Sequence, residues 1–417
     1  MSGDPAGNGR VGGEQAGTRR VGAGRGYLRD LAALLVGGLA LRPQILVIGP
    51  LLPAITADLA VDHGTAGLLG TIPVLCMGLL APLGPVMAAR LGPRSALALA
   101  ILLVGGFGLI RAAVPGVPLV LLATVGLGFG MAASGPILAM IVRARLPAHP
   151  SLGTGGYVTG LIVGGSIAAA VAVPLADAFG GWRGALAIIS AAALGSLVGW
   201  WILAGRDEAA AGSTGFARLP RPPLPWRRRT GWHLGLVFGT QSTLFYGTIS
   251  WLPSIFVERG WSELEAAGLV AFFNVVGLAA SLSVPLFADR LGSRRSQLSI
   301  ASVAALVGAI AIGATGGAAP GDPGVLAAVT LLAFGIGAFF PLSLVLPVDV
   351  AEGPSDASAL AAMMLLVGYL LSSTAPFVLG ALRDASGDFS LSAWALAAIA
   401  ATMLPLSLSV RGRRFSR

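Results

Sequence analysis

A single arginine, Arg42, lies in the middle of a long apolar segment that covers residues 29–57. In a helix that rises about 1.5 Å per residue, Arg42 lies roughly 20 Å from the start of this segment. That depth is too great for the side chain to reach either surface of a bilayer, and a guanidinium in hydrocarbon costs several kcal/mol. We therefore expect Arg42 to face the interior of a helix bundle.

A binding role for Arg42 follows from where the acidic residues are. Every carboxylate falls in a loop or near the end of an apolar segment, so the counter-charge is expected to come from a substrate. The forked guanidinium suits a carboxylate or a planar oxyanion. The alternative is structural, because Pro43 removes a backbone hydrogen bond to Leu39 and Arg42 could cap the carbonyl groups that this leaves free.

Polar side chains within other apolar segments are further candidates for the same site. They are Gln241, Ser242, Tyr246, Tyr157, Tyr369 and Asn274. For Gln241 the alternative is a hydrogen bond between helices. For the tyrosines the alternative is a place in an aromatic belt at the membrane interface.

The composition requires a membrane around these residues. Of 417 residues, 55% are hydrophobic and only 11% are charged, with a mean hydropathy of +0.84. A soluble domain of this length exposes too much surface to be so poor in charge. The formal net charge of +9 comes from arginines between the apolar segments, which argues against a nucleic-acid partner. Cys76 is the one cysteine and the histidines lack ligand spacing, so no disulfide, metal site or cofactor is expected.

The placement of arginine predicts the orientation of the chain. All 27 basic residues are arginine. Besides Arg42, four of them lie in the predicted outer segments and 22 in the predicted inner segments. The positive-inside rule then puts both termini in the cytoplasm. A span needs about 20 apolar residues, and we predict an all-α protein of twelve transmembrane helices in a bacterial cytoplasmic membrane. The four outer arginines are Arg111, Arg183, Arg259 and Arg383.

A proline- and arginine-rich segment divides the chain into two parts. We interpret it as a cytoplasmic linker whose charge fixes the topology; an alternative is a patch that binds anionic lipid. Each part then holds six spans. The predicted organisation is a disordered cytoplasmic tail at 1–28, an N-terminal half at 29–204, the linker at 205–231, a C-terminal half at 232–410 and a second tail at 411–417.

The two halves are similar in sequence. Residues 85–95 read PVMAARLGPRS and residues 285–295 read PLFADRLGSRR, so six of eleven positions are identical at an offset of 200. Repeats of six spans are a transporter architecture with the substrate site between the halves, near the midplane. Under this offset Arg42 corresponds to Ser242. Gln241 or Ser242 should therefore approach the cavity that Arg42 faces, with Tyr246 one helical turn further along.

The repeated loops resemble the Asp-Arg-x-Gly-x-Arg signature that follows the second and eighth spans in the major facilitator superfamily. The resemblance implies a conformational latch on the cytoplasmic side. The first-half copy has Ala89 in place of the signature aspartate, so that copy lacks the carboxylate of the latch. The implied latch residues are Arg90 and Arg94 in the first copy and Asp289, Arg290 and Arg294 in the second.

More specifically, the chain resembles the cyanate and 2-nitroimidazole transporter branch of that superfamily. The resemblance rests on LRP at 41–43, GPLLPAI at 49–55, PLADAFGGWRGAL at 174–186, QSTLFYGTISWLPSIFVERG at 241–260 and GYLLSSTAPFVLGALRDASG at 368–387. In the superfamily the fifth, seventh and eleventh spans line the cavity, and these carry the three tyrosines. Ala40 and Gly135 stand where the branch has Asn, which makes the expected cavity less polar.

The expected function is secondary transport of a small anion by alternating access, with Arg42 as the binding group. No Asp, Glu or His lies at a midplane position, so exchange or facilitated diffusion is favoured over proton symport. The alternative is an exporter of small neutral or weakly acidic drugs such as nitroimidazoles. The sequence has neither a catalytic Ser/His/Asp set nor a nucleotide-binding loop, so an enzyme is not expected. The expected partners are a small molecule and the bilayer, and the protein is expected to be a monomer.

Overall fold

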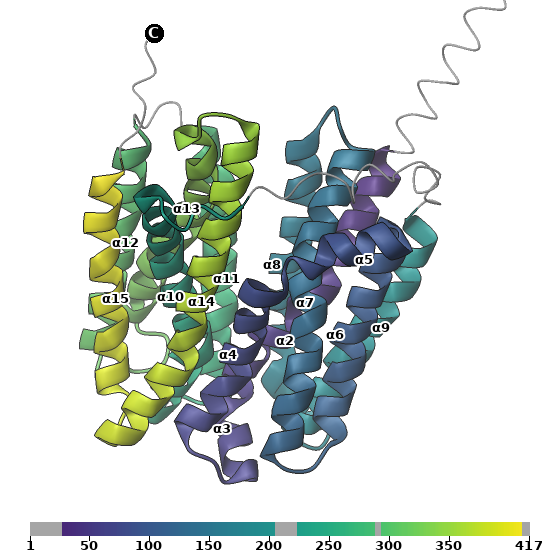
Figure 1. Cartoon of the computed structure of the whole chain (residues 1–417). Helices are drawn as coiled ribbons and strands as arrows, with labels where there is room; N and C mark the ends of the chain where they lie inside the picture. Colours follow the sequence, from purple (N-terminus) through teal and green to yellow (C-terminus); the bar gives the residue numbers. More distant parts are fainter. Residues whose placement is uncertain (1–26, 205–222, 288–292, 411–417) are drawn as a thin grey trace, which may run out of the picture.

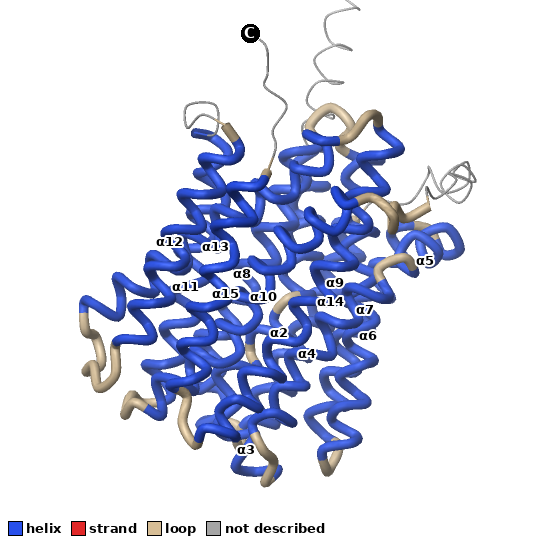
Figure 2. Tube along the Cα trace, turned by 60° about the vertical axis from the view of Figure 1, so that its left-hand side comes forward, coloured by secondary structure: helices blue, strands red, loops and turns tan. Residues whose placement is uncertain are grey.

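The computed structural model of the chain describes residues 27–204, 223–287 and 293–410. Within these ranges all regular structure is helical and no strand occurs. Figure 2 shows the helices following one another through short loops. The all-α prediction is confirmed, whereas most of the predicted tails and of the predicted linker lies outside the described residues.

The N-terminal half begins with a helix over residues 27–41. The elements that follow are α2 (Pro43–Leu46), α3 (Ile48–Leu59), α4 (His63–Leu80), α5 (Leu83–Leu91), α6 (Pro93–Ala113), α7 (Val117–Arg145), α8 (Pro150–Ala178) and α9 (Trp182–Leu203). The first helix, α2 and α3 together form one candidate span over Tyr27–Leu59. The short α5 continues from α4 after a turn.

The C-terminal half contains the remaining elements. They are α10 (Arg229–Glu258), α11 (Glu263–Phe287), α12 (Arg294–Ala314), α13 (Pro323–Val350), α14 (Pro354–Ser386) and α15 (Ser390–Ser409). Eleven segments of the described chain are long and apolar enough to cross a membrane. The predicted count of twelve spans depends on α10, which is not among those eleven. This helix is 30 residues long, but its buried face carries the polar residues Gln241, Ser242 and Thr243.

The first span is not one continuous helix, as residues 29–57 would suggest, but is broken near its middle. The first helix ends at Leu41, Arg42 forms a bend, and a second interruption follows at Val47. Pro43 lacks a backbone N–H and its ring clashes with the preceding turn, which explains the first break. The four-residue α2 between the two breaks carries Gln44 and is wholly buried.

The helices form two bundles that Figure 1 shows side by side, with α10 to α15 in one and the earlier elements in the other. The bundles meet where α4 packs against α14, α8 against α11, and α3 against α10. Glycine makes two of these approaches possible. A Cβ at Gly49 would collide with the carbonyl oxygen of Ile249, and a Cβ at Gly67 would collide with that of Pro376.

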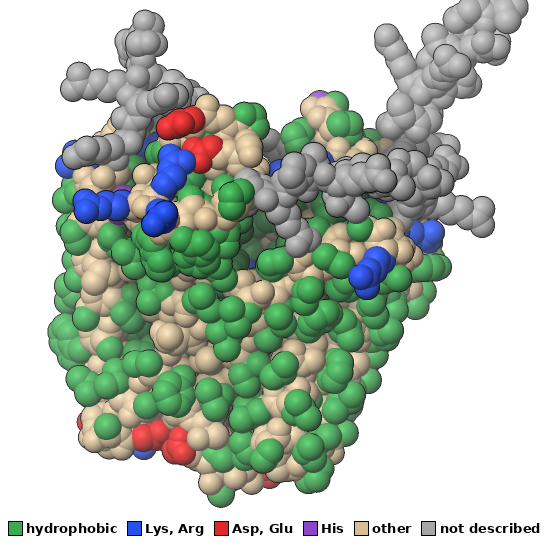
Figure 3. Space-filling view, in the orientation of Figure 1, with side chains coloured by type: hydrophobic (Ala, Val, Ile, Leu, Met, Phe, Trp, Pro, Cys, Tyr) green, Lys and Arg blue, Asp and Glu red, His purple; other side chains and the backbone are tan. Residues whose placement is uncertain are grey.

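The two ends of the bundles differ in charge. We call the end with the start of α6, the end of α7 and the starts of α10 and α12 the arginine-rich end, and the opposite end, with His63 and Asp384, the far end. Figure 3 shows charged side chains gathered near both ends of the visible face, with a hydrophobic band between them. In Figure 1 the bundles converge at the far end and lie further apart at the arginine-rich end. A charge-poor band of this kind is what a bilayer requires.

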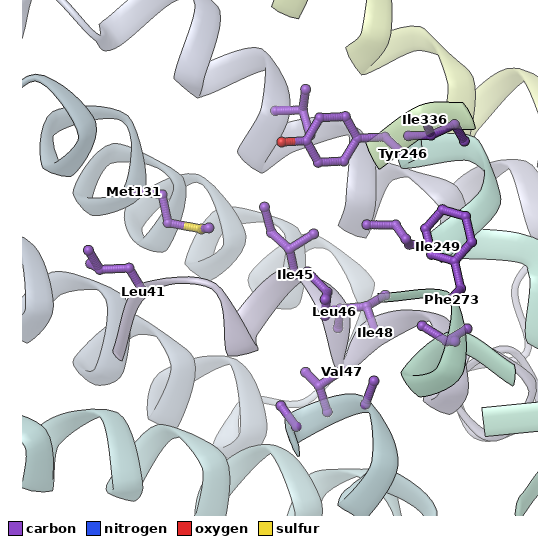
Figure 4. Close-up of a cluster of buried hydrophobic side chains, with 14 of the residues drawn as sticks. Leu41, Ile45, Leu46, Val47, Ile48, Met131, Tyr246, Ile249, Phe273 and Ile336 are labelled. Carbon is purple, nitrogen blue, oxygen red and sulfur yellow. The ribbon is translucent and has the colours of Figure 1, made fainter. Parts of the chain in front are cut away.

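A hydrophobic cluster fills the junction between the bundles around the broken span. Figure 4 shows Ile45 and Ile48 of the first span close to Ile249 of α10 and Phe273 of α11. All four side chains are buried. This packing holds the segment after Arg42 against the C-terminal half through apolar contact.

Candidate functional site

Arg42 lies at the break in the first span, and its side chain reaches the junction of the two halves. The Cζ atom is 5.1 Å from the centroid of the Phe245 ring on α10. A cation over an aromatic face is attracted by the ring quadrupole, by about 0.5–2 kcal/mol. The Arg42 side chain also passes next to Gly165 of α8, where an added Cβ would lie 3.3 Å from Cγ of Arg42. The guanidinium is thus placed between α8 of one half and α10 of the other.

The Arg42 guanidinium has no hydrogen-bond or ion-pair partner within the described ranges 27–204, 223–287 and 293–410. The backbone carbonyl of Arg42 is satisfied by the N–H groups of Ile45, at 3.2 Å, and Leu46, at 3.4 Å. In this part of the chain the side chain does not cap the carbonyl groups near Pro43, which was the structural alternative. The N–H donors of this half-buried guanidinium are therefore not used by the described residues.

The three predicted tyrosines are linked to Arg42 by short-range electrostatic interactions, Tyr246 and Tyr369 directly and Tyr157 through Tyr369. Tyr369 on α14 interacts in this way with Tyr246, Arg42 and Tyr157, and Tyr246 interacts with Arg42. The Tyr246 hydroxyl points from α10 toward the N-terminal half, 3.9 Å from Sδ of Met77 on α4. The structure therefore brings together four residues that are far apart in the sequence.

Aromatic rings pack around this group of side chains. Phe245 contacts Tyr246 edge-on with ring centroids 5.2 Å apart, and Phe238 contacts Tyr369 in the same manner at 5.4 Å. Edge-to-face pairs of this kind are the favoured geometry for neighbouring rings. The surroundings of Arg42 are thus aromatic and hydroxylated, and no acidic group of the described residues pairs with it.

The other predicted polar residues make hydrogen bonds within the C-terminal half. The Gln241 amide nitrogen donates to the carbonyl of Ile336 on α13 at 3.3 Å, which is the contact between helices that was the alternative for this residue. The Ser242 hydroxyl donates to Oε1 of Gln241 at 3.1 Å. Asn274 donates to the carbonyl of Val270, one turn earlier in its own helix, at 2.8 Å. All three side chains are buried, and none is paired with Arg42.

The predicted latch is described only in part. Arg94 donates to the carbonyl of Trp201 at 2.6 Å and lies over the Trp201 ring, 4.4 Å from its centroid. Arg294 forms an ion pair with Asp349 at 3.3 Å. Each contact ties the start of one helix to a neighbour in the same half. Arg90 is exposed, and Asp289 and Arg290 lie outside the described residues.

A surface hollow of about 660 Å³ lies at the arginine-rich end, away from Arg42. Its lining includes Trp226, Arg228 and Asp356, at the starts of α10 and α14. Arg228 and Asp356 form an ion pair there. None of the aromatic residues around Arg42 lines this hollow, so we do not assign it to a substrate.

The sequence alone did not reveal Phe245, although it lies directly before a predicted site residue. A cation without an acidic partner favours an aromatic face, but the sequence offers several such rings and does not say which one is opposite Arg42. Arg111 was placed in an outer segment. In the structure it belongs to the last turn of α6 and is fully buried, which that placement did not reveal.

Family membership follows from the sequence pattern once this fold is established. Residues 34–376 match the pattern of the Major Facilitator Superfamily, a range that begins within the first span, ends within α14 and leaves out α15. The chain belongs to the Major Facilitator Superfamily. Members of this family are membrane transporters. The predicted family and the predicted fold are therefore confirmed, and so is the prediction that the chain is not an enzyme.

Relatives of known sequence support the same assignment for this major facilitator protein. An uncharacterized transporter, YycB, of Bacillus subtilis (strain 168) is 30% identical over 84% of this chain and 85% of its own length. The 2-nitroimidazole transporter of Escherichia coli (strain K12) is 28% identical over 88% of this chain and 92% of its own length. The cyanate transport protein CynX of the same strain is 29% identical over 88% of this chain and 93% of its own length.

Solved structures confirm the major facilitator fold and carry no further information about the substrate. The nucleoside transporter NupG superposes with a TM-score of 0.73 at 13% identity, over 92% of this chain and 99% of that chain. A D-xylose-proton symporter superposes with a TM-score of 0.67 at 18% identity, over 91% and 96%. At such low sequence identity these comparisons support the fold alone.

Proposed function

We infer that this major facilitator protein is a secondary transporter of a small anion, a carboxylate or a planar oxyanion. The observation that carries the inference is the guanidinium of Arg42, half-buried at the junction of the two halves and without an acidic partner in the described chain. A buried charge of this kind requires compensation, and an anionic substrate supplies it. That a relative is named a cyanate transport protein supports the same class of ligand.

The residues near Arg42 have complementary roles in this proposal. The Arg42 fork binds the anion, and the hydroxyl groups of Tyr246 and Tyr369 are neutral donors within range of it, with Tyr157 next to Tyr369. Donation from several neutral groups to one anion strengthens binding without adding another buried charge. Gln241, Ser242 and Asn274 remain candidates for substrate contact in a second conformation.

Alternating access is the proposed transport mechanism. The halves contact each other at the far end and diverge at the arginine-rich end, so one side of the site is closed by helix packing. Rocking of one half against the other about the site would reverse this. By the positive-inside rule we assign the arginine-rich end and both termini to the cytoplasm, which makes this conformation an inward-facing one.

The site also favours one mode of energy coupling in this proposal. No acidic residue or histidine occurs near the midplane, and Arg42 carries a permanent charge. A carrier with an empty site would move this charge uncompensated, which raises the barrier to reorientation. Exchange of one anion for another is therefore proposed as the main mode, in place of proton symport or net flux.

A second candidate function is export of small neutral or weakly acidic aromatic compounds. The aromatic surroundings of Arg42, formed by Phe245, Tyr246 and Tyr369, favour it, because flat rings stack well against such walls. One relative is named a 2-nitroimidazole transporter. In this case Arg42 would stay on the face of Phe245 and contribute to structure.

A thermal-shift experiment on the purified protein separates the two functions. Cyanate, nitrate, acetate and 2-nitroimidazole are each added to the wild-type protein and to the Arg42→Ala variant, and ligand binding raises the unfolding temperature by mass action. The anion proposal expects a shift with at least one anion in the wild type and none in Arg42→Ala. Arg143→Ala removes an exposed arginine and serves as control, with a shift equal to the wild type. Equal stabilisation of all three proteins by 2-nitroimidazole alone would favour the exporter.

A further inference from the structure

A second buried arginine, Arg111, lies in the last turn of α6 and is fully buried. No acidic residue within the described ranges forms an ion pair with it. Its Nη2 atom donates to two acceptors of the same residue, the Oε1 atom of Gln44 at 2.8 Å and the backbone carbonyl of Gln44 at 3.3 Å. Among the described residues, its Nε and Nη1 atoms have no hydrogen-bond partner. A fully buried cation kept without a counter-charge is costly, which calls for a role beyond packing.

Gln44 connects Arg111 to the broken span that carries Arg42. It belongs to α2, the four-residue helix between the breaks at Arg42 and Val47. Its amide nitrogen donates to the Ser190 hydroxyl on α9 at 2.9 Å. The amide also lies against the backbone of α6, since a Cβ added at Gly108 would be 3.0 Å from both Nε2 and Oε1. Gln44 is therefore held from two sides, by α6 and by α9.

The mechanical consequence concerns the direction of the Arg42 side chain. A segment of four residues with a break at each end has little helical rigidity of its own, because short helices depend on tertiary contacts. The rotation of α2 about its own axis is therefore fixed by the groups that contact its side chains. Arg42 immediately precedes this segment, so the rotation of α2 sets the direction in which the guanidinium leaves the backbone.

We propose that Arg111 is a positioning residue that, by clamping Gln44, aims the Arg42 guanidinium at the substrate. This inference rests on the proposed function, in which Arg42 binds an anion. Arg111 does not itself touch the substrate. The shape of the guanidinium matters, because Nη2 donates to both the backbone carbonyl and the side-chain oxygen of Gln44. A lysine ammonium is a compact charge on a side chain of different shape, so it would not occupy the same position.

The test combines anion binding with a double-mutant cycle. The affinity of the anion that stabilises the wild type, out of cyanate, nitrate and acetate, is measured for Arg111→Met, Gln44→Leu and the double variant. Each single variant is expected to weaken binding about tenfold, and the double variant no more than either single one, because both remove the same clamp. Additive losses, or an affinity equal to the wild type in Arg111→Met, would overturn the proposal. Arg111→Lys is expected to recover less than half of the affinity that Arg111→Met loses, measured as the logarithm of the dissociation constant.

The matched control is Arg183→Met. Arg183 donates to the carbonyls of Ala112 and Val114, next to Arg111 at the same end of α6, but does not contact Gln44. This variant tests a general loosening of that end of the bundle. Arg183→Met is expected to bind the anion with the affinity of the wild type. A tenfold loss of affinity in this variant would mean that Arg111→Met acts by loosening that end of the bundle.

A second readout does not depend on any ligand. In a Cys76→Ser background, Arg42→Cys is labelled with N-ethylmaleimide with and without Arg111→Met. A loosened α2 is expected to change the labelling rate by about threefold or more, because the thiol then samples other directions. An unchanged rate would overturn the clamp. If Arg42→Ala binds the anion as well as the wild type but the labelling rate changes, the proposed function fails and the clamp stands.

Discussion

The Nδ1 atom of His63 lies 2.7 Å from Oδ1 of Asp384, and this contact joins the two halves at the far end. His63 begins α4, and Asp384 lies in the last turns of α14. The other carboxylate oxygen of Asp384 accepts a hydrogen bond from the backbone N–H of Gly64 at 2.8 Å. The His63 ring packs against both Trp251 and Phe389, with centroids 5.8 and 5.5 Å away. One carboxylate thus holds the start of a helix in the opposite half.

The first prediction is that Asp384→Asn destabilises the conformation closed at the far end. The amide removes the carboxylate charge from both contacts, and its NH2 group can face Nδ1 of His63 only when that nitrogen carries no proton. The loss is expected to be about 1–2 kcal/mol. Spin labels on Ala113→Cys and Ala319→Cys, exposed positions at the far end of each half, would report a larger population of long distances in a Cys76→Ser background.

The control for this prediction is Asp388→Asn at the same end. The Asp388 carboxylate accepts from the N–H of Ser390 within its own half, so it bridges nothing. Its distance distribution should match that of the unmodified pair of labels. If the two variants shift the distances equally, the bridge between the halves is not what closes this end.

The second prediction concerns the chemistry of Arg42. Arg42→Ala should abolish anion binding, and Arg42→Lys should fail to restore it, because an ammonium lacks the planar fork that binds two oxygens at once. Binding is measured by thermal shift or calorimetry on folded protein, with membrane insertion checked by yield. An affinity of Arg42→Lys equal to that of the wild type would contradict the assigned role.

The third prediction concerns the ring of Phe245 beneath the guanidinium. Phe245→Leu removes the aromatic face and should weaken anion binding about two- to fivefold, in keeping with a cation–π energy of about 0.5–1 kcal/mol. Phe245→Tyr keeps the face and should bind within error of the wild type. As a control for packing, Phe273→Leu changes a buried ring 6.0 Å from Phe245 that does not face Arg42. Similar losses in both leucine variants would point to packing.

The fourth prediction is that exchange is faster than net transport. Proteoliposomes preloaded with unlabelled anion should take up labelled anion faster than empty ones, because a loaded site neutralises Arg42 during reorientation. Water in the cavity screens the charge and limits the difference. Equal rates, or accumulation driven by a pH gradient alone, would exclude exchange as the main mode.

Part of the Arg42 site could be predicted because the bilayer acts on each residue separately. A guanidinium in the middle of an apolar span must point away from lipid wherever its neighbours lie. The 200-residue repeat likewise pointed to α10 as the helix opposite the first span, and α10 does contribute Phe245 and Tyr246. For Gln241 the repeat could not distinguish a cavity contact from the hydrogen bond to Ile336, because both require a buried polar face.

The sequence by itself determined the membrane class, the family, the repeated halves and the interior position of Arg42, because hydropathy, charge and local motifs are properties of a segment. Only the tertiary structure decided which side chains meet across helices: Phe245 with Arg42, Gln44 with Arg111, and His63 with Asp384. These pairs depend on the rotation and axial position of each packed helix. Arg111 shows the physical reason, since its place near a helix end predicts exposure, whereas the packing of α2 and α9 beside it excludes all solvent.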